Sequence, residues 1–66
     1  MIIKFSNKIY KIGAVKSSAK AYRGLADFKI SQTKDYIKAE LKNIDQSVKN
    51  IIKDEFCNYV LAMMKT

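Results

Sequence analysis

The chain has 66 residues and carries 13 Lys and Arg against 6 Asp and Glu, which gives a net charge of +7. A chain of this length forms one domain, residues 1–66, and buries only about 60% of its unfolded surface. It contains no His and a single Cys, so the usual groups for acid–base, metal and nucleophilic chemistry are absent or isolated. We therefore expect a binding or accessory protein and not an enzyme, with no catalytic residue, no metal and no cofactor.

The setting expected from the sequence is cytoplasmic. A single Cys cannot form an internal disulfide, and residues 1–10 lack the charged region and long apolar run of a signal peptide. The longest apolar run, residues 59–64, has six residues, whereas a membrane-spanning helix needs roughly 20. We expect no membrane partner.

The first elements are a strand and a helix. Residues 2–5 have the composition of a strand, and Ser6 and Asn7 interrupt it before residues 8–10 resume the pattern, which fits either one bulged strand or a tiny hairpin. The apolar period then becomes that of a helix, with steps of 3, 4 and 3 residues from Ile12 to Tyr22. This spacing predicts a helix over residues 12–23, ended by Gly24 in the left-handed conformation.

A hairpin and a second helix follow. Apolar and other residues alternate on both sides of residues 32–35, which predicts strands at residues 26–31 and 36–41. Asp45 offers a side-chain oxygen to the amides of Ser47 or Val48, as a helix N-cap does. Apolar residues then recur at steps of 4, 4, 3 and 4, which predicts a long unbroken helix: Val48, Ile52, Phe56, Tyr59 and Met63.

The element order is β-α-β-β-α, that of a ferredoxin-like split unit without its last strand, and the fold class is α+β. Because such crossovers are right-handed, the third strand fits between the first two and gives an antiparallel sheet of order 1-3-2 with both helices on one face. The predicted core is Phe5, Val15, Ala19, Tyr22, Phe28, Ile30, Ile37, Ala39, Leu41, Ile52, Phe56 and Tyr59. The open face is polar and has one aromatic residue: Lys4, Lys29, Tyr36, Lys38 and Glu40.

The second helix carries a further apolar stripe at helical spacing, Cys57, Val60, Leu61 and Met64. One interpretation is that these residues pack on the first helix or cover the end of the sheet. The other is a seam for a homodimer or another protein, where the flexible Met side chain suits an irregular surface. Cys57 has no His to activate it, and Asp54 and Glu55 point about 100° apart on the helix, so neither pattern predicts catalysis.

Positive charge belongs to the first half of the chain. Residues 1–33 hold seven Lys and Arg and one Asp, whereas residues 34–66 hold six Lys and five Asp and Glu. One hypothesis is a phosphate-facing patch that binds nucleic acid weakly and in a salt-dependent way, made of Lys4, Lys11, Lys16, Lys20 and Arg23. Twelve of the thirteen cations are Lys, which favours ordinary solvated side chains over specific phosphate recognition.

The chain also resembles a known family. The residues that carry the resemblance are Ile9-Tyr10 before Ala14-Val15-Lys16, the hairpin, Glu55-Phe56-x-Asn58, and Leu61 near the end. With these residues the chain is similar to the His-Xaa-Ser system HxsD-like family. The resemblance implies a small accessory protein encoded beside radical S-adenosylmethionine maturases and their short precursor peptides, and it assigns no activity to particular residues.

Sheet order 1-3-2 leaves both outer strands with a free edge, to which an extended peptide can add through main-chain hydrogen bonds. The candidate docking edges contain Ile2, Lys4, Phe5 and Lys29. We therefore expect a peptide- or maturase-binding adaptor. The alternatives are a small basic nucleic-acid-binding protein and a homo-oligomeric structural module.

Overall fold

The computed structural model describes residues 1–65. Its elements are β1 (Ile2–Ser6), α1 (Ile12–Ala21), β2 (Asp27–Gln32), β3 (Tyr36–Lys42), the 3-10 turn η1 (Gln46–Val48) and α2 (Ile52–Met64). The predicted order β-α-β-β-α and the α+β class are confirmed. Within residues 1–65, none of the helices combines the length and apolar character that crossing a bilayer requires.

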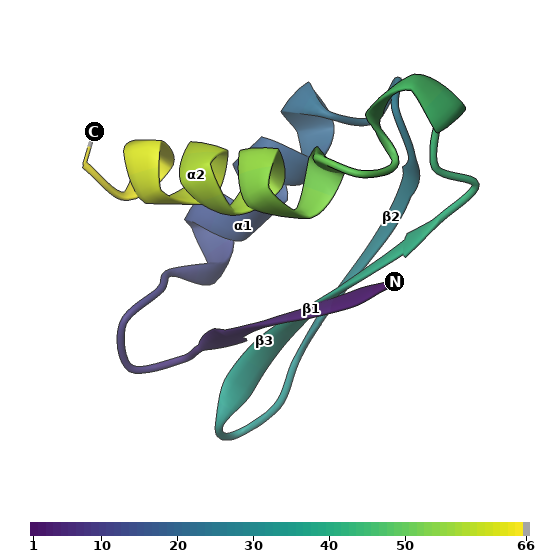
Figure 1. The fold of residues 1–66 in the computed structure, drawn as a ribbon. Coiled ribbons are helices and arrows are strands. Elements are labelled where there is room, and N and C mark those ends of the chain that lie inside the picture. The colour runs from purple at the N-terminus through teal and green to yellow at the C-terminus, as the bar shows by residue number, and fades with distance from the viewer. Residues whose placement is uncertain (66) are drawn as a thin grey trace.

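The three strands form one sheet of order β1-β3-β2, and both pairs are antiparallel, as predicted. Lys4 lies opposite Lys38 in the first pair, and Lys29 lies opposite Glu40 in the second. Both helices cover the same face of the sheet, with α2 and β1 nearer the viewer in Figure 1 and α1 and β2 behind them. Within residues 1–65, no helix covers the opposite face of the sheet.

Alternation along the strands builds the core. On the central strand, Ile37, Ala39 and Leu41 are buried, while the residues between them face the open side. Phe56 of α2 is fully buried at the centre of a group of rings, with centroid distances of 6.1 Å to Phe5, 5.8 Å to Tyr22 and 5.0 Å to Phe28. These rings come from β1, β2, α2 and the turn that follows α1, so the core joins these segments.

The core-facing side of α2 differs from the prediction. Val60, expected on the outer stripe, is fully buried, whereas Tyr59, expected in the core, is 38% exposed. The buried stripe is Ile52, Phe56 and Val60, at constant steps of four residues. Tyr59 instead packs its ring edge-on against Tyr22, with 5.4 Å between centroids, at the margin of the core. A tyrosine is suited to this position because its ring packs while its hydroxyl stays hydrated.

Two helix ends also differ from the prediction. Helix α1 ends at Ala21, and neither Gly has a positive φ angle, so Gly24 is not a left-handed cap. The chain leaves α1 through a turn in which the Leu25 amide donates to the Tyr22 carbonyl at 2.9 Å. This bond spans three residues and closes the turn without a left-handed residue.

The second helix is interrupted near its start. Asp45 does cap a turn, since its Oδ1 accepts hydrogen bonds from the Ser47 amide at 2.9 Å and the Ser47 hydroxyl at 2.7 Å. The capped element is η1, and α2 begins only at Ile52. The single helix predicted from Val48 onward is therefore divided into a short 3-10 turn and an α-helix.

Candidate functional site

The free edge of β1 is set by its pairing with β3. Met1 and Leu41 exchange two hydrogen bonds, 3.1 Å from the Met1 ammonium to the Leu41 carbonyl and 2.8 Å from the Leu41 amide to the Met1 carbonyl. Main-chain direction alternates along an antiparallel strand, so Phe5 turns its main chain toward β3, while Ile2 and Lys4 turn theirs outward. Phe5, which is also only 3% exposed, is therefore a core residue and not part of the docking edge.

The free edge of β2 follows from the same alternation. The Thr33 amide donates to the Tyr36 carbonyl at 2.8 Å, which fixes the hydrogen-bonded pairs at every second residue of the hairpin. Lys29 therefore turns its main chain toward β3. Phe28 and Ile30 turn their amides and carbonyls toward the open edge. The sequence analysis included Lys29 in a docking edge. In the structure its main chain faces β3, and only its side chain lies near this edge, on the open face of the sheet.

A groove runs along the free edge of β2, between this strand and α1. It has a volume of 460 Å³. Its apolar floor includes the half-buried side chains of Phe28 and Ile30, and its rim carries two cations of α1 and one of the turn that follows it. The lining residues are Lys16, Ala19, Lys20, Arg23, Ala26, Asp27, Phe28 and Ile30. We call this feature the α1–β2 groove.

The five residues of the predicted basic patch lie in three places. Lys16, Lys20 and Arg23 share the rim of the α1–β2 groove. Lys4 is on the open face of the sheet, with its ammonium 4.8 Å from the centre of the Tyr36 ring. Lys11 precedes the first turn of α1, and its amide donates to the sulfur of Met64 at 3.2 Å. The structure thus keeps three of the five cations together and separates the other two from them.

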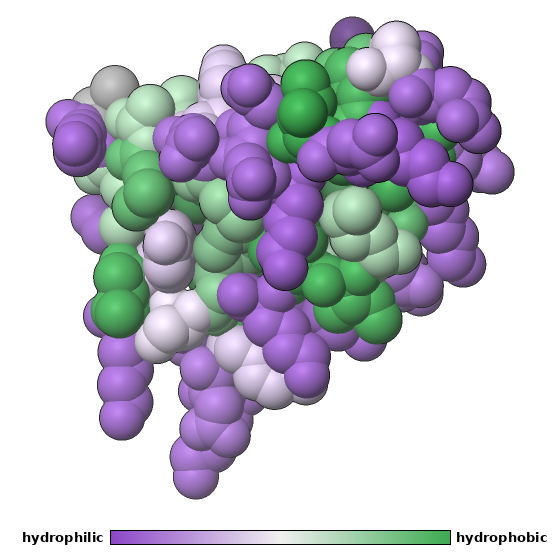
Figure 2. Space-filling model, in the orientation of Figure 1, coloured by the Kyte–Doolittle hydropathy of each residue, from purple (hydrophilic) through white to green (hydrophobic). Residues whose placement is uncertain are grey.

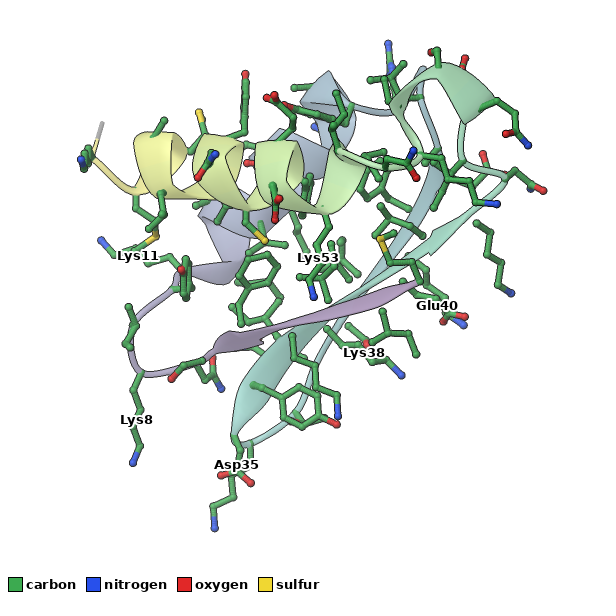
Figure 3. The ribbon with its side chains drawn as sticks, viewed as in Figure 1. Lys8, Lys11, Asp35, Lys38, Glu40 and Lys53 are labelled. Carbon is green, nitrogen blue, oxygen red and sulfur yellow. The ribbon has the colours of Figure 1, made fainter. Side chains whose placement is uncertain are left out.

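The open face has the predicted composition. Lys38 and Glu40 of β3 point away from the helices in Figure 3. Glu40 forms an ion pair with Lys42 at 3.7 Å. On β1, β2 and β3, Tyr36 is the one aromatic residue whose side chain faces this side. Sheets that bind RNA stack bases on two or three rings, so this face is a poor platform for RNA.

The apolar stripe predicted on the second helix is less exposed than expected. Leu61 is 44% exposed, Cys57 and Met64 are half-buried, and Val60 belongs to the core. In Figure 2, hydrophilic side chains separate the apolar groups on the side where α2 and β1 face the viewer. A continuous apolar patch, which typically marks a stable interface, is therefore not visible on this side.

Burial raises the pKa of two side chains in or next to the helices, Cys57 and Tyr22. Burial raises the pKa of the Cys57 thiol, against a smaller opposing effect of Lys53, so the thiol stays protonated near neutral pH. Burial also raises the pKa of Tyr22, helped by Glu55 and Tyr59. Among residues 1–65, His, Cys, Asp and Glu side chains form no group of three that could hold a metal ion.

Sequence reasoning missed the α1–β2 groove. It assigned Phe28 and Ile30 to the core because they alternate with polar residues. The alternation correctly places both side chains on the helix-covered face of the sheet. It does not show how completely a helix covers that face. The signal that pointed to a gap is the small size of the residues that α1 buries, Val15, Ser18 and Ala19. Small side chains leave the strand beneath them partly uncovered.

Comparison of the chain with protein-family models, with curated proteins and with solved structures finds no match. The HxsD-like resemblance and the ferredoxin-like description of the element order therefore stay predictions.

Proposed function

We propose that this chain is a non-catalytic, cytoplasmic accessory protein that binds an extended peptide along an edge of its sheet. Its partner in this proposal is a precursor peptide or a radical S-adenosylmethionine maturase of a peptide-modification system, as the HxsD-like resemblance implies. The observation that carries the proposal is the strand order β1-β3-β2, in which both outer strands have one side without a neighbouring strand.

Free edges are features that soluble proteins usually protect. Short strands, charged side chains, proline, bulges and coverage by other elements are the common means of protection, and β2 carries one of them in the charged Asp27 and Lys29. Here the chain contains no proline, and β2 pairs with β3 in continuous register over six residues, without a bulge. An edge left in this condition suits the addition of a strand from a partner, because main-chain hydrogen bonds then supply affinity.

A second candidate function is nucleic-acid binding, and one observation favours it. Lys16 and Lys20 of α1 and Arg23 of the turn after it line the same groove, which gives a group of three cations. This candidate ranks second because the open sheet face has a single aromatic residue and because Lys4 and Lys11 lie elsewhere. It predicts binding to single-stranded oligonucleotides that weakens steeply between low and moderate salt. Absence of binding at low salt would exclude it.

The proposed function is tested by capture of partners from the native host. The tagged protein is purified with and without nuclease, and the retained proteins and peptides are identified by mass spectrometry. The proposal expects a radical S-adenosylmethionine enzyme or a short precursor peptide, retained after nuclease treatment. Recovery of RNA-associated proteins that disappear with nuclease would overturn the proposal in favour of the second candidate. Sedimentation of the purified protein tests the homo-oligomeric alternative.

A further inference from the structure

We infer that the α1–β2 groove is the docking site of an acidic extended peptide, which joins β2 as a fourth strand. The inference rests on the proposed function and deepens it by choosing one of the two free edges and the chemistry of the occupant. Three observations carry it: the direction of the main chain of β2, the apolar floor of the groove, and its cationic rim, whose cations form no ion pair within residues 1–65.

The first observation concerns hydrogen bonds. Phe28 and Ile30 turn their amides and carbonyls outward, so β2 offers two donors and two acceptors along the groove. The outward-facing part of β2, from Phe28 to Gln32, spans about 14 Å at 3.4 Å per residue, which is the length of about five extended residues. A peptide in the groove can therefore continue the sheet by the same ladder that joins β2 to β3.

The second observation concerns the floor. Side chains of an added strand alternate between the two faces of the sheet, so every second side chain of the peptide enters the groove. There it meets Phe28, Ile30 and Ala19, which line the groove. Phe28 and Ile30 are half-buried, so an occupant would remove apolar surface from water.

The third observation concerns charge. Lys16 and Lys20 of α1, about 6 Å apart along the helix axis, and Arg23 in the turn after α1 line the groove. Asp27 is the one carboxylate among the lining residues, and its Oδ2 accepts a hydrogen bond from the Asn43 side chain at 2.7 Å. The groove therefore has a net charge of +2. Within residues 1–65, none of its three cations has an ion pair.

Together, these features select Glu at the positions that enter the groove. Its two methylenes cover the apolar floor, and its carboxylate reaches the rim. Every second residue of a strand repeats at about 6.8 Å, and Lys16 and Lys20 are separated by about 6 Å along the helix axis. Successive Glu side chains on one side of the peptide therefore match successive cations on α1.

A second copy of this chain is a poor occupant. Its outer strands carry Lys4 and Lys29, and pairing either strand with β2 would bring cations toward the cationic rim. A nucleic acid would use the three cations but not the main-chain groups of Phe28 and Ile30. These two occupants are therefore separate outcomes of the test.

The test uses the full chain labelled with ¹⁵N and a capped seven-residue peptide, Thr-Glu-Val-Glu-Val-Glu-Thr. The control peptide has Gln in place of each Glu. Amide shifts are followed by NMR at low salt during titration with each peptide. We expect the largest shifts at Phe28 and Ile30, small shifts at Ile2 and Lys4, and at least tenfold weaker binding of the Gln peptide.

Two pairs of variants sharpen the test. Ile30→Pro removes the outward amide without removing a bond to β3, and it should weaken binding at least tenfold, whereas Lys4→Pro on the β1 edge should not. Lys20→Glu should weaken binding about tenfold, and Lys49→Glu, outside the groove, should leave it unchanged. Should Ile30→Pro fail to fold, the Lys20→Glu and Lys49→Glu pair decides.

Three results overturn the inference. Shifts at Ile2 and Lys4 in place of Phe28 and Ile30 would move the site to β1 and leave the proposed function in place. A single-stranded oligonucleotide that binds more tightly than the Glu peptide and shifts only α1 would identify the groove rim as a nucleic-acid surface. Absence of binding of the Glu peptide at millimolar concentration would exclude this site, while the partner capture from the native host would still decide the proposed function.

Discussion

Each side of the molecule places one helix over one edge strand of the sheet, but the two edge strands are buried to different extents. On one side, α2 packs large residues against the sheet, and the core-facing side chains of β1 are buried beneath them, with Ile3 4% and Phe5 3% exposed. On the other side, α1 packs small residues, and Phe28 and Ile30 of β2 stay half-buried. The side chains of the covering helix thus decide whether an edge strand contributes only to stability or also offers a surface for recognition.

This division separates two roles within a small domain. The α2–β1 side supplies two of the largest fully buried side chains, Phe56 and Ile52, and the α1–β2 side supplies the groove. Substitutions on the first side should therefore act on stability, and those on the second should act on binding.

The largest effect on stability is expected from a charge placed in the core of the α2–β1 side. Val60→Asp places a carboxylate at a fully buried position without a partner, which should cost roughly 4 kcal/mol or more and leave much of the protein unfolded. Leu61→Asp, at a position that is 44% exposed, should change the free energy of unfolding by less than about 0.5 kcal/mol. Urea unfolding followed by circular dichroism measures both.

The same Leu61→Asp variant tests the predicted seam of α2. We expect its sedimentation to match that of the parent chain, because Leu61 is the one strongly exposed member of the stripe. Conversion of a dimer to a monomer by this substitution would instead establish the seam and the homo-oligomeric alternative.

A matched pair of phenylalanines compares the two edge strands. Phe5 of β1 and Phe28 of β2 both face the Phe56 ring, at 6.1 and 5.0 Å between centroids. Phe5→Ala should cost about 3–4 kcal/mol because its ring is buried, and Phe28→Ala should cost about 1–2 kcal/mol less because its ring is half-buried. Equal losses in urea unfolding would contradict the comparison between the two sides.

A thiol reagent reports on the packing of α2. Because burial raises the pKa of Cys57, less thiolate is present at pH 8 than in an unfolded chain. Iodoacetamide should therefore modify Cys57 several-fold more slowly in the native protein than in urea, and the midpoint of its pH–rate profile should move to higher pH. Identical profiles in both conditions would show that the thiol is not protected.

The smallest effect concerns the cap of η1. The hydrogen bonds from the hydroxyl and amide of Ser47 lower the pKa of Asp45 below its ordinary value of 3.8. The stabilisation is therefore fully present above pH 3.8 and is lost as the pH falls through the lower pKa of the folded state. Asp45→Ala should reduce the melting temperature slightly at pH 6, and the difference from the parent should vanish in strong acid. Asp35→Ala, at the tip of the hairpin in Figure 3, is the matched control.

The fold was predictable because local patterns decide most of it. Alternation placed Ile37, Ala39 and Leu41 on one face, and the handedness of the crossover fixed the position of β3 between its neighbours. The errors occur where tertiary packing overrides a local rule. Val60 and Tyr59 are adjacent in sequence, and only the position of Tyr22 after α1 shows which of them lies at the margin of the core.

The candidate site was predictable only in part. Sequence reasoning anticipated two free edges and a cationic α1, because both the strand order and the charge distribution follow from the sequence. It did not anticipate that Lys16, Lys20 and Arg23 line a groove beside Phe28, since this depends on how far a helix of small residues extends over a strand. Incomplete coverage is a property of the assembled layers and has no local sequence pattern.

The position of Phe56 also has a consequence for how the protein folds. The rings around it belong to residues 5, 22 and 28, so the core gathers segments that are up to 51 positions apart in the chain. No pair of neighbouring elements completes this ring cluster alone. Folding should therefore be all-or-none, with the near-ultraviolet signal of the Tyr and Phe rings and the far-ultraviolet signal of the backbone lost together in a single transition.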